Sequence, residues 1–235
     1  MRYRSEDTIA AIATPPGVGG VGIVRLSGSR AVPIAAQVFR PSAPRALADQ
    51  PSHLMLHGWI ERQGAPIDEA LAVCMRAPHS YTAEDVVELQ CHGGPMVLRT
   101  VLELLCAAGA RLAQPGEFTQ RAFFNGRIDL TRAEAVGDIV GAGSLLGLQA
   151  SANQLRGRLY EAIRALQGDV AHVAALVAAG IDFPEEDVVF ARRDDILGRL
   201  QHGRDRLQAL VRGAGQGRLL REGLAVAIVG KPNVG

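Results

Sequence analysis

The sequence has little of several features that mark specialised classes of protein. Lys231 is its only lysine and the net charge is +1, so no global basic field is available for nucleic acid, and such a contact needs a local patch or another part of the protein. Cys74, Cys91 and Cys106 lack CxxC spacing and lie in apolar segments. This pattern predicts buried, reduced thiols and a cytoplasmic protein.

Signals for secretion or membrane insertion are also scarce. The first residues, MRYRSED, are followed by no apolar signal core. The longest apolar-rich stretch, around 169–182, is expected to be too short and too interrupted to span a bilayer. What the chain does have is a composition for burying a core, 48% hydrophobic and 21% charged over 235 residues, enough for one large or two smaller domains.

Residues 1 to about 125 read as mixed α/β. Short β-rich runs bounded by glycine, proline and polar residues predict strands within 7–14, 21–28, 53–60, 69–77 and 84–92, with a turn-rich connection at 61–68. A helix is expected to begin at Pro95 and to stop near Gly109. The segment 111–118 then returns as a short strand and a turn.

From about residue 119 the pattern becomes helical. Thr131 and Glu134 form a capping box that predicts the start of one helix. Apolar spacings of three, four and seven predict a continuous helix over 144–180, of roughly ten turns. A second long amphipathic helix is expected over 192–215, antiparallel to the first, as part of a bundle. A boundary follows at 220–223, and the apolar run 224–230 predicts a strand.

The string GVGGVG matches the dinucleotide-binding pattern G-x-G-x-x-G through Gly17, Gly19 and Gly22. A Rossmann site needs a helix after the glycines, because the helix N-terminus holds the pyrophosphate. Here the next run, 21–28, is a predicted strand. We therefore interpret the string as a flexible strand–loop–strand connection that can line a ligand.

Polar residues alternate along 84–92, so Glu88, Gln90 and His92 share one face of the predicted strand. Two interpretations stay open: a solvated polar strand face, or the wall of a pocket. A carboxylate in such a wall suits a donor–acceptor heterocycle of the guanine or pterin kind. His53 and His57 do not make a convincing metal pair, since no acidic third ligand is near them in the sequence.

The last ten residues, VAIVGKPNVG, resemble a strand entering a Walker A loop, G-x-x-x-x-G-K-[ST]. Gly230 and Gly235 match its two glycines, with Lys231, Pro232, Asn233 and Val234 between them. The lysine and the hydroxyl residue of the motif would come next. We therefore expect a fragment of a longer protein, cut inside the loop, that by itself neither binds nor hydrolyses GTP appreciably.

Five segments together resemble the MnmE (TrmE) family of GTPases that modify the wobble uridine of certain tRNAs. They are DTIAAIATPPGVGGVGIVRLSG, SYTAEDVVELQCHGGP, QPGEFTQRAFFNGRIDLTRAEAVGDIV, IDFPEED and LLREGLAVAIVGKPNVG. The resemblance implies an α+β N-terminal domain over 1–125, related to folate-binding aminomethyltransferase domains. It further implies the first part of an α-helical domain over 126–221, and the start of a truncated Ras-like α/β G domain over 222–235.

The resemblance also implies an activity. The family acts with the flavoprotein MnmG, which brings FAD and NADH, to install an aminomethyl-type group at C5 of the uridine. A 5-formyl-tetrahydrofolate-type folate is the implied one-carbon donor, GTP hydrolysis depends on potassium and magnesium, and the N-terminal domain forms a homodimer. Two alternatives stay open: a non-enzymatic folate-binding dimerisation scaffold, and an unrelated P-loop ATPase with an α/β prefix.

Site residues follow from the same resemblance, position by position. The folate contacts fall on Arg25, Glu88 and Arg127, where some members have lysine at the last position. The partial phosphate loop falls on the glycines and intervening residues of 230–235, with Asn233 matching a potassium ligand, and no catalytic residue is implied within the chain. The alternation along 84–92 agrees for Glu88 alone, which is predicted on the polar side of its strand.

Overall fold

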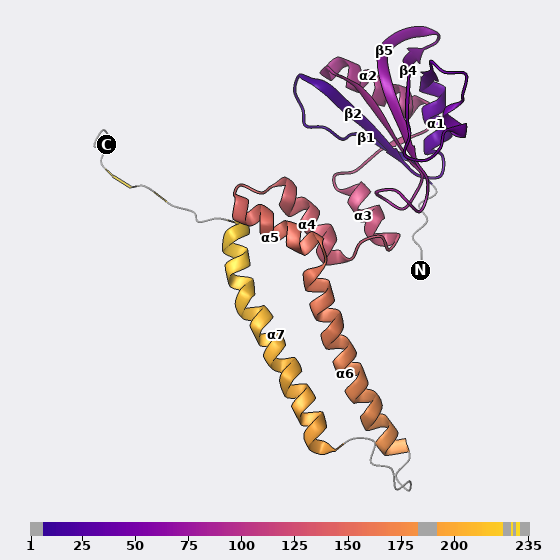
Figure 1. Cartoon of the computed structure of the whole chain (residues 1–235). Coiled ribbons are helices and arrows are strands. Elements are labelled where there is room, and N and C mark those ends of the chain that lie inside the picture. The colour runs from indigo at the N-terminus through magenta and orange to yellow at the C-terminus, as the bar shows by residue number, and fades with distance from the viewer. Residues whose placement is uncertain (1–6, 183–191, 223–226, 228, 231–235) are drawn as a thin grey trace. The chain divides into compact units, whose positions relative to one another are not determined.

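The structure is a computed structural model that describes residues 7–182, 192–222, 227, 229 and 230. The chain forms two compact units, Met1–Asp129 and Leu130–Gly235 (Figure 1). The N-terminal unit is built on a sheet, and the second unit is helical. Each unit is described by itself below.

One seven-stranded sheet forms the N-terminal unit, in the spatial order β3-β4-β5-β6-β2-β1-β7. All neighbouring strands are antiparallel except the parallel edge pair of β1 and β7. The strands are β1 Ile9–Ile12, β2 Gly19–Ser27, β3 Phe39–Pro41, β4 Met55–Arg62, β5 Ala65–Met75, β6 Val86–Gly93 and β7 Arg111–Leu112. The five predicted strand runs are thus confirmed as β1, β2, β4, β5 and β6.

Helices cover one face of this sheet. Helix α1 (Ala31–Val38) contacts β2, β4 and β6, and helix α2 (Pro95–Ala107) contacts β1, β2 and β6. A 3₁₀ turn, η1 (Leu47–Asp49), packs beside α1, and helix α3 (Glu117–Phe124) ends the unit. Buried apolar side chains from the sheet and from α1 and α2 form a single core cluster, so burial of this one face is the main source of stability in the unit.

The other face of the sheet is partly open and carries polar groups. Along β6 the buried residues Val87, Leu89 and Cys91 alternate with the half-buried Glu88 and Gln90. The predicted alternation is therefore confirmed, because a strand of period two sends one set to the helix-covered core and the other to the open face.

Glycines let two strands and a helix approach closely where the string GVGGVG ends. A Cβ at Gly22 would collide with the side chain of Leu98 on α2, and a Cβ at Gly93 would lie 2.5 Å from the carbonyl oxygen of Gly19. The chain continues into β2 and no helix follows the string. The structure thus agrees with a strand–loop–strand connection and gives these glycines a packing role.

The N-terminal unit differs from the sequence predictions at two places. Helix α1 was not predicted: it is only eight residues long and contains Pro33, so its periodic signal is weak. The connection expected over 61–68 shrinks to Gln63 and Gly64, both at positive φ. Strand β5 already begins at Ala65, since this two-residue turn lets β4 and β5 pair almost to their ends.

The helical unit contains four helices, α4 Leu130–Val140, α5 Leu145–Leu155, α6 Arg158–Asp182 and α7 Arg193–Glu222. Helices α6 and α7 lie side by side and run in opposite directions (Figure 1). The predicted antiparallel pair is therefore confirmed. Arg206 Nη1 of α7 lies 3.9 Å from Asp169 Oδ2 of α6, which is a long and exposed contact.

The continuous helix expected over 144–180 is wrong. It is divided into α5 and α6 at Gly157, whose φ of +89° is left-handed. Glycine tolerates this conformation, so a single residue ends one helix while the apolar spacing continues into the next. The start of α5 is capped by Ser144, whose hydroxyl accepts a hydrogen bond from the Gly147 amide at 3.1 Å.

Helix α6 contains the apolar stretch around 169–182 that was predicted to be too short to span a bilayer. At 25 residues with a mean hydropathy of 1.2 over its most apolar window, it is long and apolar enough to cross a bilayer by length and composition alone. The expectation that this stretch is too short is therefore wrong as to length. The same measure is met by core helices of soluble proteins, so a single helix of this kind is weak evidence for a membrane span.

The predicted strand over 224–230 lies largely outside the described residues. Of the partial phosphate loop, Gly230 is described and belongs to no regular element. Lys231, Pro232, Asn233, Val234 and Gly235 all lie outside the described residues, and with them the potassium ligand expected at Asn233.

Candidate functional site

The site begins with a pair of charged residues on neighbouring strands. Arg25 of β2 and Glu88 of β6 are direct cross-strand partners. Arg25 Nε donates a hydrogen bond to Glu88 Oε1 at 2.7 Å, and Arg25 Nη2 lies 2.7 Å from the same oxygen. The two side chains are 27% and 15% exposed, so this pair on the open face of the sheet is only partly hydrated.

Aromatic rings bring the third predicted residue to this pair. The guanidinium carbon of Arg25 lies 5.4 Å from the centre of the Tyr81 ring and 5.7 Å from that of Phe118. The guanidinium carbon of Arg127 lies 5.0 Å from the centre of the same Tyr81 ring. The structure therefore gathers Arg25, Glu88 and Arg127, which are 102 residues apart at the extremes, around one tyrosine.

The geometry of the ion pair leaves part of Glu88 available. Both short contacts from Arg25 go to Oε1, and no described protein group donates a hydrogen bond to Oε2. This carboxylate oxygen can accept an N–H from a ligand without breaking the pair with Arg25. An ionised carboxylate accepts at both oxygens, and charge-assisted bonds of this kind are among the stronger ones.

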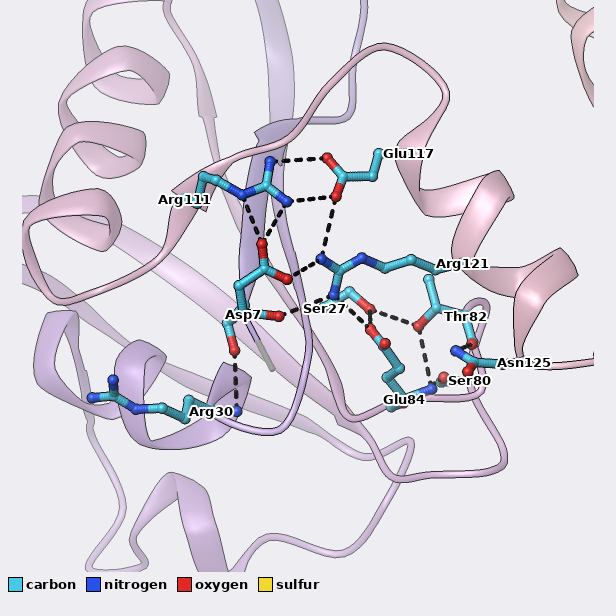
Figure 2. A network of polar contacts seen from close by, with 11 residues as sticks. Asp7, Ser27, Arg30, Ser80, Thr82, Glu84, Arg111, Glu117, Arg121 and Asn125 are labelled. Atoms are coloured by element: carbon cyan, nitrogen blue, oxygen red, sulfur yellow. Dashed lines mark hydrogen bonds and ion pairs between the residues drawn. The ribbon is translucent and has the colours of Figure 1, made fainter. Parts of the chain in front are cut away.

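A buried polar network holds the elements that carry these rings (Figure 2). At its centre Arg121 of α3, 2% exposed, donates hydrogen bonds to three carboxylates: to Asp7 Oδ1 at 2.7 Å, to Glu84 Oε2 at 3.1 Å and to Glu117 Oε1 at 3.2 Å. Arg111 binds both Asp7 and Glu117. Arg121 thus ties α3 to the loop before β6 and to Asp7, two residues before β1.

The loop before β6 is fixed at several further points. Glu84 Oε2 also accepts a hydrogen bond from the Ser27 hydroxyl at 2.7 Å, and Ser27 and Thr82 share a 2.6 Å hydroxyl contact. Asn125 donates to the carbonyl oxygen of Thr82 at 2.8 Å. Because Thr82 follows Tyr81, these contacts restrain the backbone that places the tyrosine ring.

Charges within the network shift one another. Hydrogen bonds from Arg111, together with those from the Gln114 amide and Arg121, lower the pKa of Glu117 against the opposing effect of its burial. Hydrogen bonds to Glu117 and Asp7 raise the pKa of Arg111. Burial opposes the charged form of Arg121, yet Glu84, Asp7 and Glu117 together raise the pKa of that guanidinium. Arg111, Glu117 and Arg121 are therefore held in their charged forms.

The other polar residues of β6 lie in a separate place. Gln90 and His92 line a shallow pocket of about 270 Å³ together with His57, Glu69 and the Gly20–Val21 part of β2. His92 Nδ1 lies 2.6 Å from Asp68 Oδ1, and His57 Nε2 lies 2.7 Å from Glu69 Oε1. The hydrogen bond to Asp68 raises the pKa of His92. The polar face predicted over Glu88, Gln90 and His92 is thus divided between the Arg25 pair and this pocket.

No group of three or more His, Cys, Asp or Glu side chains within 7–182, 192–222, 227, 229 and 230 is arranged to hold a metal ion. Cys74 and Cys91 are buried and free, whereas Cys106 is half-buried. Burial raises the pKa of the Cys91 thiol to about 12, which makes it a poor nucleophile. The expected buried thiols are confirmed for two of the three cysteines.

Two family models divide the chain between them. The model described as "GTP-binding protein TrmE N-terminus" matches residues 8–127, and the "MnmE helical domain" matches residues 130–225. The chain belongs to the MnmE (TrmE) family. The family predicted from five sequence segments is therefore confirmed, and its two matched regions coincide closely with the two compact units of the structure.

Individual MnmE relatives agree over nearly the whole chain. It is 48% identical over 231 residues to the tRNA modification GTPase MnmE of Symbiobacterium thermophilum. It is 51% identical over 233 residues to that of Moorella thermoacetica and 52% identical over 232 residues to that of Synechococcus sp. strain JA-3-3Ab. These matches cover 97–98% of this chain and 50% of each relative. The chain thus spans about half the length of the curated relatives it matches.

The MnmE helical unit carries an apolar groove between its two long helices. A groove of about 500 Å³ runs between α6 and α7, with walls that include Ile163, Leu166, Val173, Leu200 and Leu207. Many apolar residues of these helices are exposed, Val170, Leu200 and Leu207 among them. The apolar stripes predicted for the two long helices are thus present, and many of their side chains stay exposed within the described residues.

Sequence reasoning missed the residues that assemble the site. Tyr81 and Phe118 lie in segments used to recognise the MnmE family, yet neither was assigned a role. Arg121 has partners as far away as Asp7, 114 positions earlier, and no local pattern signals such a pairing. Aromatic residues are only 4% of the chain, but Tyr81 lies far from Arg25 and Arg127 in the sequence, so their contact is visible only in the structure.

Proposed function

We propose that the chain binds a reduced folate of the 5-formyl-tetrahydrofolate type at the recess formed by Arg25, Glu88, Tyr81 and Arg127. The observation that carries the proposal is the meeting of these side chains from β2, β6 and two loops on the open face of the sheet. The α+β N-terminal unit would then be a folate-binding domain of the aminomethyltransferase-like kind.

The chemistry of the recess suits a pterin. Glu88 Oε2 can accept from the N–H and amino edge of the ring. Arg25 and Arg127 present planar donor groups that bind carbonyl or carboxylate oxygens. Two arginines against one glutamate give the recess a local charge of +1, which favours a ligand that also bears anionic groups, as a folate does through its glutamate tail.

Isothermal titration calorimetry with 5-formyl-tetrahydrofolate tests this proposal. The wild-type chain is expected to bind, and Glu88→Ala to lose charge-assisted hydrogen bonds, roughly 1.5–3 kcal/mol each. Glu103→Ala is a matched control, because Glu103 is an exposed carboxylate on α2 that pairs only with Arg99 among the described residues. Equal affinity of the wild-type and Glu88→Ala chains would reject the assignment.

For the whole protein we propose the activity that the relatives' names describe, modification of tRNA by a GTPase. Acting with the flavoprotein MnmG, it would install an aminomethyl-type group at C5 of the wobble uridine, with the folate as one-carbon donor, in the cytoplasm. GTP, magnesium and potassium would bind at a G domain whose phosphate loop includes residues 230–235, with Asn233 as a potassium ligand.

The 235-residue polypeptide itself is proposed to bind folate but not GTP. Its Walker motif comprises only the first six positions, without the lysine and the hydroxyl residue that contact the phosphates and magnesium. Titration with a fluorescent GTP analogue should therefore show no saturable signal below millimolar concentrations. Tight binding of the analogue to the purified polypeptide would contradict this.

Homodimerisation through the N-terminal unit is also proposed. Val18, Val21 and Met96 are large apolar side chains at 90%, 62% and 74% exposure on the β1–β2 connection, the start of β2 and the start of α2. Exposed apolar residues of this kind favour a protein contact. Light scattering on the wild-type and Val21→Glu chains tests it: the wild type is expected to be dimeric and the variant to shift toward monomer.

A second function, a non-enzymatic folate-binding scaffold, is favoured by one observation. The α6–α7 groove is apolar and open, so the helical unit would gain stability from further helices packing on it. Hydrogen exchange measured on the 235-residue polypeptide tests this. Amides of α6 and α7 should exchange much faster than those of β2 and β6. Full protection over 130–222 would reject the idea that the helical unit needs further helices to be stable.

A further inference from the structure

Tyr81 occupies an unusual electrostatic position. Its ring is approached by two guanidinium groups, those of Arg25 and Arg127, both within 5.4 Å of the ring centre. Both groups are positively charged, and of the two only Arg25 forms an ion pair, with Glu88, among the described residues. An attraction other than this ion pair is therefore needed to hold Arg127 at the same place.

The tyrosine ring supplies that attraction. The face of an aromatic ring carries negative quadrupole density and attracts guanidinium groups within about 6 Å. The ring is itself held in place: the Tyr81 hydroxyl shares a 2.8 Å hydrogen bond with Thr119 of α3, and Asn125 fixes the carbonyl of the adjacent Thr82. The ring is thus a fixed surface that both guanidinium groups contact.

The buried network explains why the ring cannot turn away. Glu84, three residues after Tyr81, is bound by Arg121, and Thr119 lies two residues before Arg121 on the same helix. Arg121 therefore joins the helix that carries Thr119 to the loop that carries Tyr81, through its contact with Glu84 (Figure 2). This anchoring fixes the ring before any ligand arrives, which lowers the ordering cost of binding.

We propose that Tyr81 is the positioning residue of this site, gathering Arg25 and Arg127 beside Glu88 so that the recess selects planar ligands that bear anionic oxygens. This inference rests on the proposed folate binding and adds to it a residue that acts through the two arginines. The ring is the part of Tyr81 that contacts the two arginines, and the hydroxyl acts only by holding that ring through Thr119.

Calorimetry with 5-formyl-tetrahydrofolate on five variants of the 235-residue chain separates the possibilities. Tyr81→Leu should weaken binding about tenfold, and Tyr81→Phe should stay within about threefold of the wild type, since it keeps the ring. In an Arg127→Ala background, adding Tyr81→Leu should weaken folate binding by less than about threefold. One of the two guanidinium groups that the ring positions is already absent in that background. Glu88→Ala is titrated in the same series, because its loss of affinity tests the proposed folate site independently of Tyr81.

Several outcomes would overturn the proposal. Wild-type affinity in Tyr81→Leu, an undiminished effect in the Arg127→Ala background, or a Tyr81→Phe chain as weak as Tyr81→Leu would each reject a role through the ring. If the wild type itself fails to bind, the proposed folate function falls and takes this inference with it. Binding that responds to Glu88→Ala but not to Tyr81→Leu rejects the inference alone.

A ligand-free measurement on the wild type keeps the test independent of variant folding. Protons on the δ-carbons of Arg25 and Arg127 should be shifted upfield in the NMR spectrum by the ring current of Tyr81, and a control arginine on the exposed surface, Arg99, should not be. Random-coil shifts for both site arginines would overturn the proposal even if Tyr81→Leu cannot be purified folded.

Discussion

The two units bury their apolar residues to different degrees. In the N-terminal unit, buried side chains from the sheet, α1 and α2 form one continuous core. In the helical unit, the buried hydrophobic residues among those described are Ala135, Leu166 and Val173. Since apolar burial is the dominant favourable term in folding, the N-terminal unit has what it needs to be stable alone, and the helical unit has an apolar groove still to cover.

The two units also differ in where their ion pairs lie, in the interior or on the surface. The N-terminal unit places a guanidinium in its interior with three carboxylates around it. In the helical unit the ion pairs Arg204–Asp205 and Arg206–Asp169 are exposed, and exposed pairs contribute little to stability. The N-terminal unit thus has paired charges in its interior, whereas the ion pairs described in the helical unit lie on its surface.

The largest effect that would test this contrast is expected from Arg121→Met. Removing one side of a buried charged network leaves three carboxylates poorly compensated, and the free energy of unfolding of the N-terminal unit should fall by about 3–5 kcal/mol. Urea unfolding followed by circular dichroism measures it. Arg204→Met, an exposed arginine of the helical unit, should change stability by no more than about 0.5 kcal/mol. A loss below about 1 kcal/mol for Arg121→Met would contradict the contrast.

A matched pair of leucine truncations compares the two interiors directly. Leu89→Ala empties a fully buried site on β6 and should cost about 3 kcal/mol, in the middle of the range for enclosed cavities. Leu166→Ala, on the wall of the open α6–α7 groove, should cost about 1 kcal/mol because water and neighbouring side chains can fill the space. Equal losses from the two substitutions would show that the groove is already covered in solution.

A smaller effect is expected at the joint between α5 and α6. Gly157→Ala places a Cβ on a residue at φ +89° and against the guanidinium of Arg132, which can move aside. The remaining backbone strain should cost about 1 kcal/mol. Thermal unfolding of this variant should therefore show a lower Tm for the helical unit and an unchanged Tm for the N-terminal unit. A change in the N-terminal transition instead would mean that the units do not unfold separately.

The smallest expected effect is a pH dependence confined to the N-terminal unit. Asp68 raises the pKa of His92 above its ordinary value of 6.5, so the folded protein holds this proton more tightly than the unfolded chain does. The resulting stabilisation is present in full below about pH 6.5 and fades as the pH rises through the higher folded value. NMR titration of the His92 ring should give the raised pKa, and Asp68→Asn should return it toward 6.5.

Much of the N-terminal sheet could be predicted because alternation leaves a local record. Val87, Glu88 and Leu89 show by their order alone which side faces the core. The break at Gly157 could not be predicted, since the apolar spacing continues across it and a glycine inside a helical pattern is ambiguous. Helix α1 was too short for a clear period.

The site was only half predictable for a related reason. Glu88 could be placed by alternation, whereas Arg25 and Arg127 came only through the family resemblance. Their meeting at Tyr81 depends on pairings between distant parts of the chain, such as Arg121 with Asp7 and Glu84. Nothing in the spacing of these residues encodes the contact, because the fold and not the neighbourhood in sequence brings them together.

The network around Arg121 has a consequence for synthesis of the protein. Asp7 is made among the first residues, but its partners Arg111 and Arg121 follow more than a hundred residues later. Strand β1 can pair with β2 as soon as β2 has been made, whereas its other neighbour, β7, is made much later. While the chain emerges from the ribosome, closure of this edge of the sheet therefore waits for β7 and α3.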